Sequence, residues 1–135
     1  MDFIIKKEHL NERNEYVGEI DVSNLDGNLI ADGNLGYIKF KSINVSGFIL
    51  FKAGSGINAG WGIKAGLGIE AGSGIKAGLG IEAGLSISAQ TITTPLRIFA
   101  GLCLWRNPSE EEMKVMAKRI DGGGVIAFGE FEKIE

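Results

Sequence analysis

Cysteine, histidine and aromatic residues are all scarce in this chain of 135 residues. Cys103 is the only cysteine, which excludes an intramolecular disulfide and a zinc site built from several cysteines. A lone cysteine of this kind is typical of a small buried hydrophobic position. His9 is the only histidine and stands beside Lys6, Lys7 and Glu8, which indicates a solvated surface rather than a catalytic site.

Long apolar runs and a strong excess of one charge are missing as well. No run approaches the roughly 18 apolar residues of a membrane-spanning helix, and residues 1–16 lack the apolar core of a secretion signal. We therefore expect a soluble, cytoplasmic protein with no membrane contact. The net charge of -3, with both signs interspersed, gives no broad basic face, so nucleic acid is not an expected partner. No catalytic triad or carboxylate pair stands out, and we assign no catalytic residue, cofactor or metal site.

Glycine, by contrast, is abundant, with 21 residues that follow no collagen-like triplet. Eleven of them belong to a six-residue repeat, Ile-x-Ala-Gly-x-Gly, between residues 51 and 92. The isoleucines of the repeat are Ile57, Ile63, Ile69, Ile75, Ile81 and Ile87. Each is followed by a polar residue and an alanine, which predicts a three-residue strand with isoleucine and alanine on one face. The glycines suit corners between such strands.

The variable positions of the repeat predict how many residues make one coil. An 18-residue coil stacks like on like: Trp61 over Leu79, Leu67 over Leu85, and Ser55, Ser73 and Thr91 in one column. It also sets Lys64 against Glu82, whereas a 12-residue coil sets Lys64 against Lys76. Unlike charges on neighbouring strands are stabilising and like charges are not. The sequence therefore predicts an all-β fold, a triangular single-stranded β-helix (a β-solenoid) of about 18 residues per coil.

The repeat is expected to lie inside one domain with a cap at each end. Residues 1–20 form the N-terminal cap, 21–94 the solenoid and 95–135 the C-terminal cap. In the C-terminal cap, the range 96–106 indicates a long, largely buried strand. Residues 114–120 allow two interpretations: a short helix started by a Ser109–Glu112 capping box, or a strand in a hairpin with residues 125–134. The surrounding strands favour a short turn followed by the hairpin.

Four corner residues are the candidate interface: Trp61, Leu67, Leu79 and Leu85. Each lies two positions before an isoleucine, so strand alternation directs these side chains inward, where they fill the prism. If they point outward instead, they form two apolar ridges of the kind that mark an interface. The sequence leaves this orientation open, together with the handedness of the solenoid.

The hexads at residues 51–92 resemble those of the hexapeptide-repeat acyltransferases, whose triangular helix also has an aliphatic residue at every sixth position. The looser pattern of residues 20–92 is similar to bactofilins, bacterial cytoskeletal proteins that polymerise end to end. The whole chain also resembles small uncharacterised bacterial and phage proteins rich in the same repeat. The resemblance implies a β-helix.

The functional hypothesis is a non-enzymatic structural or interaction module whose rigid surface serves self-association, as a homo-oligomer, or binding of another protein. One alternative is a phage or mobile-element inhibitor of a host defence complex. The other is a hexapeptide-type acyltransferase, although His9 matches none of the histidines that such enzymes use.

Overall fold

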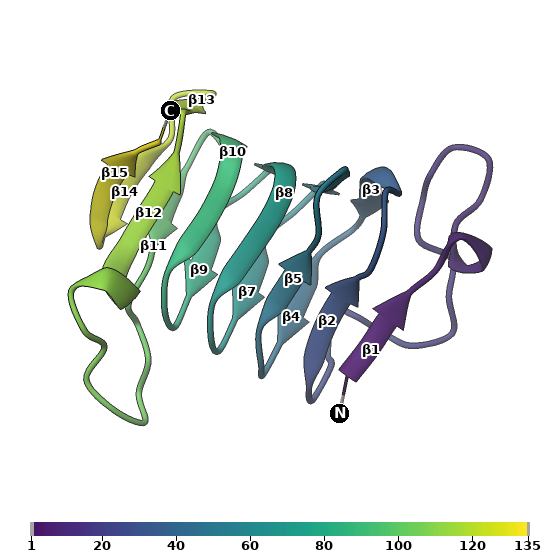
Figure 1. Cartoon of the computed structure of the whole chain (residues 1–135), viewed down its shortest axis with the longest axis horizontal. Helices are drawn as coiled ribbons and strands as arrows, with labels where there is room; N and C mark the ends of the chain where they lie inside the picture. The colour runs from purple at the N-terminus through teal and green to yellow at the C-terminus, as the bar shows by residue number, and fades with distance from the viewer. Residues whose placement is uncertain (1, 135) are drawn as a thin grey trace.

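Stacked parallel strands build the whole molecule, which the computed structural model describes over residues 2–134. The fold is a β-solenoid of about six turns with about 19 residues per turn, and 51% of the chain is strand. Figure 1 shows the strands following one another along the long axis, with the N-terminal loop at one end and the last strands at the other. The predicted all-β solenoid is confirmed.

Three faces surround the core. The first face holds β1 (Asp2–Ile5), β2 (Asn28–Ala31), β5 (Ile49–Phe51), the first part of β8 (Ile69–Ala77) and of β10 (Ile87–Thr93), β12 (Lys114–Ala117) and β15 (Glu130–Lys133). The second face holds β3 (Gly36–Phe40), β6 (Ser55–Ala59), the later parts of β8 and β10, and β13 (Arg119–Asp121). The third face holds β4 (Ile43–Val45), β7 (Ile63–Ala65), β9 (Ile81–Ala83), β11 (Arg97–Phe99) and β14 (Val125–Phe128).

The predicted step of 18 residues holds within the repeat, where Ile57 pairs with Ile75 and Ile63 with Ile81. Lys64 lies opposite Glu82, as expected, with 3.9 Å between Nζ and Oε2. One expected column is wrong: Thr91 pairs with Gly74 and not with Ser73. The reason is a register shift between Ala89 and Thr91, which shortens that coil by one residue.

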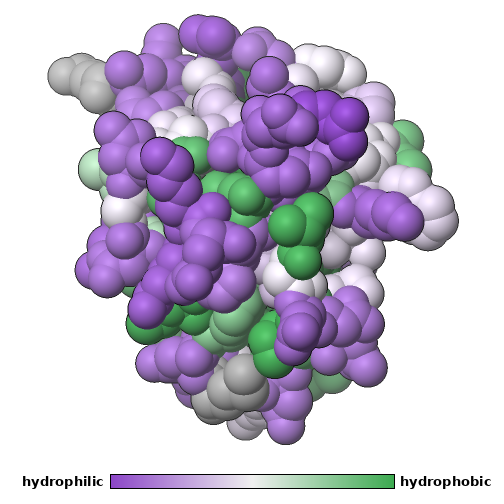
Figure 2. All heavy atoms as spheres, turned by 90° about the vertical axis from the view of Figure 1, so that its right-hand side faces the viewer, coloured by the Kyte–Doolittle hydropathy of each residue, from purple (hydrophilic) through white to green (hydrophobic). Residues whose placement is uncertain are grey.

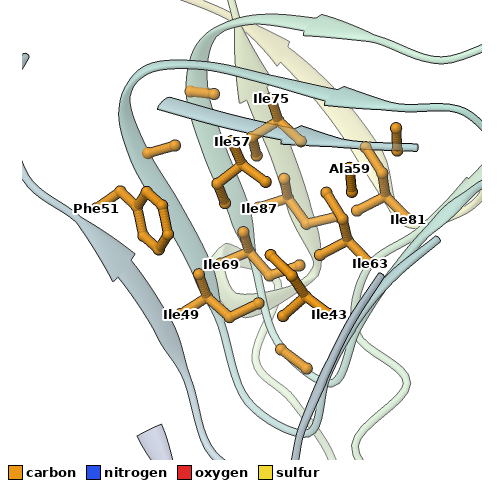
Figure 3. Close-up of a cluster of buried hydrophobic side chains, with 14 of the residues drawn as sticks. Ile43, Ile49, Phe51, Ile57, Ala59, Ile63, Ile69, Ile75, Ile81 and Ile87 are labelled. Carbon is orange, nitrogen blue, oxygen red and sulfur yellow. The ribbon is translucent and has the colours of Figure 1, made fainter. Parts of the chain in front are cut away.

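The isoleucines of the repeat form the core. Figure 3 shows them pointing toward one another from the three faces, with Phe51 at one side. Ile57, Ile75, Ile81 and Ile87 have no exposed surface, and the repeat alanines are buried beside them. Because burial of one such side chain contributes about 1.5 to 3 kcal/mol, these columns are the main source of stability.

The N-terminal segment forms an irregular first coil. β1 pairs with β2, Glu15 bridges to Lys39 on the second face, and Leu25 bridges to Val45 on the third face. A short 3-10 helix, η1 (Lys7–His9), follows β1. Figure 2 views the molecule from this end and shows a mostly hydrophilic surface with small apolar patches.

The expected long strand over residues 96–106 is wrong. Only Arg97–Phe99 is strand, and the chain then bends at Gly101, whose φ is 88°. It leaves the stack after Cys103, whose amide still donates a hydrogen bond to the Gly84 carbonyl. Leu104 and Trp105 are 95% and 70% exposed. The second half of the expected strand therefore belongs to a loop, residues 100–110, which starts at the buried Ala100 and exposes Leu104 and Trp105.

Residues 114–121 form two strands, β12 (Lys114–Ala117) and β13 (Arg119–Asp121), so strand is correct as favoured, but the expected hairpin is wrong. β13 pairs in parallel with β10, and β14 pairs in parallel with β11. This arrangement continues the coils and buries Val115 and Ala117 completely, which an isolated hairpin would not do. The capping box does form, since Ser109 and Glu112 exchange hydrogen bonds, yet it starts only the 3-10 turn η2 (Glu111–Met113).

Candidate interaction face

The outward residues of the third face form one row that is charged in the middle and aromatic at one end. In register order the row is Asn44, Lys64, Glu82, Phe99 and Phe128. The Lys64–Glu82 pair is long, at 3.9 Å, and both side chains are largely solvated. Such a pair contributes about 0 to 1 kcal/mol, so both charges are available to a partner.

An apolar ridge borders this row at the corner between the second and third faces. It consists of Trp61, Leu79 and Leu96, which are 66%, 49% and 49% exposed, and it is called the corner ridge below. The Leu79 amide donates a hydrogen bond to the Trp61 carbonyl at 3.1 Å. The Leu79 carbonyl accepts one from the Thr94 hydroxyl at 2.7 Å. These two hydrogen bonds tie the three successive coils of the corner ridge together.

The four predicted interface residues divide between two corners. Trp61 and Leu79 point outward, so the inward orientation favoured by strand alternation is wrong for them. Alternation operates only within a strand, and here β6 ends at Ala59 while β7 begins at Ile63, with a glycine-flanked corner between them. Leu67 and Leu85 stack at the corner between the third and first faces, where both are half-buried.

Sequence reasoning missed three residues of this face. Leu96 continues the corner ridge because Ile98 pairs with Ile81, which places Leu96 beside Leu79. Its position two residues before Ile98 was the available signal, but Pro95 interrupts the repeat there. No sequence pattern predicts the exposure of Leu104 and Trp105, because it depends on where the chain leaves the stack.

A hollow of about 530 Å³ lies on the third face beside Leu96 of the corner ridge. It is lined by Leu96 and Arg97 and by three members of the row, Lys64, Glu82 and Phe99. Gly62 and Gly80 also line it, and their missing side chains leave the space open. The volume lies in the range of sites that accept a large side chain or small ligand.

The loop of residues 100–110 borders the other side of the charged row. A smaller hollow of about 140 Å³ lies between this loop and the strands β7 and β9. The loop is fastened at its far end by Arg106, whose two guanidinium nitrogens lie 2.8 and 2.6 Å from the Glu112 carboxylate. The bond from Arg106, followed by that from the Ser109 amide, lowers the pKa of Glu112 to about 2.

Both tryptophans of the chain therefore flank the third face, Trp61 from the corner ridge and Trp105 from the loop. His9 lies elsewhere, at the N-terminal end, where its Nδ1 accepts the Lys6 amide at 2.9 Å and its ring packs against Phe3. In residues 2–134, no cluster of histidine, cysteine, aspartate or glutamate has the arrangement of a metal site. No helix of the same residues has the length and apolar character needed to cross a membrane.

Comparison of the chain with family models, curated proteins and solved structures yields no match. The class that the structure defines is a β-solenoid with an exposed apolar ridge on one face.

Proposed function

We propose that the protein is a non-enzymatic binding module whose third face docks another protein. The observation that carries the proposal is the corner ridge, three exposed apolar side chains of which Leu96 also lines a hollow of about 530 Å³. Exposed apolar residues that gather in one place mark interaction sites in soluble proteins. Tryptophan is also among the residues that contribute most binding energy at protein interfaces.

A protein partner suits this face better than a small molecule. The corner ridge spans three successive coils, which are spaced about 4.8 Å apart, so its contact surface is elongated. Lys64 and Glu82 beside the hollow offer one charge of each sign. We expect the partner to insert an apolar side chain into the hollow and to place charged groups near this pair, which would set the orientation of docking.

The rigidity of the scaffold supports the same function. The backbone of each corner is hydrogen-bonded to the coil beneath it, as in the bonds from Trp61 to Lys41 and from Leu79 to Trp61. A surface that is already ordered loses little conformational entropy on binding, which favours affinity. An inhibitor of a host defence complex, the first alternative above, would be one special case of this function.

Site-specific photocrosslinking tests the proposal. A photoreactive phenylalanine analogue at Leu79 should capture one protein in cells that naturally contain this chain. The same analogue at Glu70, which faces outward on the first face, is the matched control. The purified partner should then bind Trp61→Ala about thirtyfold or more weakly than the wild type. Val17→Ala, which alters an exposed residue outside the face, should bind normally.

The two tryptophans provide a second readout. Because both are exposed in the free protein, docking on the third face should shift their emission to shorter wavelength. Trp61→Phe and Trp105→Phe then assign the shift to the ridge or to the loop. Equal affinity of Trp61→Ala and wild type, together with unchanged emission on binding, would remove the third face from the function.

A further inference from the structure

Two columns of the third face decide how a second copy of this chain can pack against it. One is the charged row, in which Glu82 follows Lys64 one coil later. The other is the corner column, whose members in coil order are Lys41, Trp61, Leu79 and Leu96. Each coil adds one member to both columns. A displacement of the second copy along the solenoid axis therefore shifts the contacts of both columns by the same number of coils.

The charges of the row select the direction of a two-fold axis. An axis that runs along the row, parallel to the solenoid axis, would set Lys64 against Lys64 of the second copy and Glu82 against its Glu82. An axis parallel to the strands, midway between β7 and β9, would set Lys64 against Glu82 in both directions. Opposite charges across an interface attract and like charges repel. The second axis is therefore favoured, and it makes the two solenoid axes antiparallel.

The charges also select the position of that axis. An axis over β9 would set Glu82 against Glu82 of the second copy. An axis midway between β9 and β11 would set Glu82 against Phe99 and Lys64 against Phe128, and a charge buried without a partner is costly. Only the position between β7 and β9 gives each charge of the row an opposite charge across the contact, in addition to its neighbour in the same chain.

The same axis makes the corner ridge complementary to itself. Trp61 precedes β7 and Leu79 precedes β9, so Trp61 of each copy would lie against Leu79 of the other. The hollow of about 530 Å³ spans three coils, with Gly80 in the middle one, and that coil faces the coil of Trp61 across the axis. Leu96 would face Lys41, which lines a second hollow of about 480 Å³ at the same corner. Each ridge therefore meets the hollows of the other copy.

Two third faces that pack in this way occupy separate layers. Packed sheets lie about 10 Å apart, and no strand of one copy takes the place of a strand of the other. The five strands of the face span about 20 to 25 Å along the axis at a spacing of about 4.8 Å. Faces of this size form small interfaces, which suit reversible association. A two-fold contact closes at two copies.

We propose that two copies of this chain associate through their third faces, with antiparallel solenoid axes and Trp61 of each copy against the hollow of the other. This inference rests on the proposed function, since it names a second copy as the protein that docks on the third face. The contacts between Lys64 and Glu82 set the register of the dimer. The contacts between Trp61 and Leu79 supply apolar surface.

Light scattering across a hundredfold concentration range tests the dimer, with a mass of twice 14.4 kDa expected at the upper end. Trp61→Ala should raise the dissociation constant about thirtyfold or more, because each dimer loses this side chain twice. Val17→Ala, outside the face, should leave it unchanged. In Trp105→Phe, where Trp61 is the only tryptophan, emission should shift to shorter wavelength over the concentration range in which the mass doubles.

Charge exchange tests the register. Lys64→Glu alone and Glu82→Lys alone each set like charges across the axis, so each should raise the dissociation constant on the order of tenfold or more. An equimolar mixture of the two variants should dimerise, because each then faces the opposite charge. The double variant Lys64→Glu/Glu82→Lys should dimerise like the wild type. Glu70→Lys makes the same change of charge on the first face and is the matched control. Circular dichroism melting of each variant confirms that it is folded.

Three outcomes would overturn the inference. The first is a single-chain mass for the wild type at every concentration. The second is a dimer that Trp61→Ala leaves intact, which indicates a contact elsewhere on the molecule. The third is a mixture of Lys64→Glu and Glu82→Lys that dimerises no better than either variant alone, which indicates a different axis.

Failure of the dimer and failure of the proposed function are distinguishable. The measurements on the dimer use the purified chain alone, whereas photocrosslinking at Leu79 is carried out in cells. A monomeric chain that captures a different protein at Leu79 would remove the dimer and keep docking on the third face. A monomeric chain that captures nothing there would remove both.

Discussion

Two glycines at corners of the third face differ in what surrounds them. A Cβ at Gly84 would collide with the carbonyl oxygen of Gly66 in the coil beneath. A Cβ at Gly62 would lie 3.5 Å from the Gly80 oxygen, an ordinary contact. The close approach of coils therefore requires glycine at one corner and merely accepts it at the other.

Alanine at these two positions should change stability by different amounts. Gly84→Ala should lower the free energy of unfolding by about 1 to 3 kcal/mol, because the backbone of two coils must move apart. Gly62→Ala should leave it within about 1 kcal/mol of the wild type, since the unfolded chain loses freedom and nothing collides. Urea unfolding measures both. Similar losses in the two variants would show that the backbone spacing is not what selects glycine.

At the scale of elements, the loop of residues 100–110 is held at its start by backbone hydrogen bonds to neighbouring coils and at its far end by an ion pair. Cys103 donates its amide to the Gly84 carbonyl at 2.9 Å, and the far end depends on the Arg106–Glu112 pair. The ion pair stabilises the charged form of the Glu112 carboxylate. The far end of the loop is thus sensitive to acid.

Acid should release the loop through Glu112. Its pKa is lowered from 4.5 to about 2, chiefly by the bond from Arg106, so its contribution is complete above about pH 4.5. That contribution is lost as the pH falls through about 2. Carbon-detected NMR of the Glu112 carboxyl should show this midpoint, and protection of the Cys103 amide against exchange should fall with it. In Arg106→Ala the midpoint should return toward 4.5, and an unchanged midpoint would contradict the assigned cause.

At the scale of the whole molecule, the coils behave as a short one-dimensional stack. Each coil contacts only its neighbours, yet one continuous core joins them from the first coil to the last. A destabilising substitution in a central coil weakens the contacts of that coil with both neighbours. The same substitution in an end coil weakens contacts with only one neighbour. Stability should therefore depend on position along the axis.

Two isoleucine truncations should reveal this dependence. Ile75→Ala, in a fully buried central position, should cost about 2 to 5 kcal/mol and shift a single cooperative unfolding transition. Ile20→Ala, in the partly buried first coil, should cost less and should accelerate hydrogen exchange only near the N-terminal end. Equal costs, with exchange accelerated throughout the chain in both variants, would show that the molecule unfolds as one indivisible unit.

The sequence by itself determined the solenoid, its 18-residue step within the repeat and the isoleucine core. These features follow from a short repeated unit, a strand of three residues and a glycine corner. Each strand pairs with the equivalent strand one coil earlier. The pairing of Lys64 with Glu82 and the stacking of Trp61 on Leu79 follow from the same period.

Only the tertiary structure decided which way the corner residues point. The alternation of inward and outward side chains stops where β6 ends, so counting residues across the corner to β7 does not predict their direction. It also decided that residues 114–133 add parallel coils instead of a hairpin, since the buried surface beneath them lies far away in sequence. The exposure of Leu104 and Trp105 depended on where the chain leaves the stack, which is after Cys103. The candidate interaction face therefore combines repeat residues, whose stacking the six-residue period predicts, with loop residues, whose positions it does not predict.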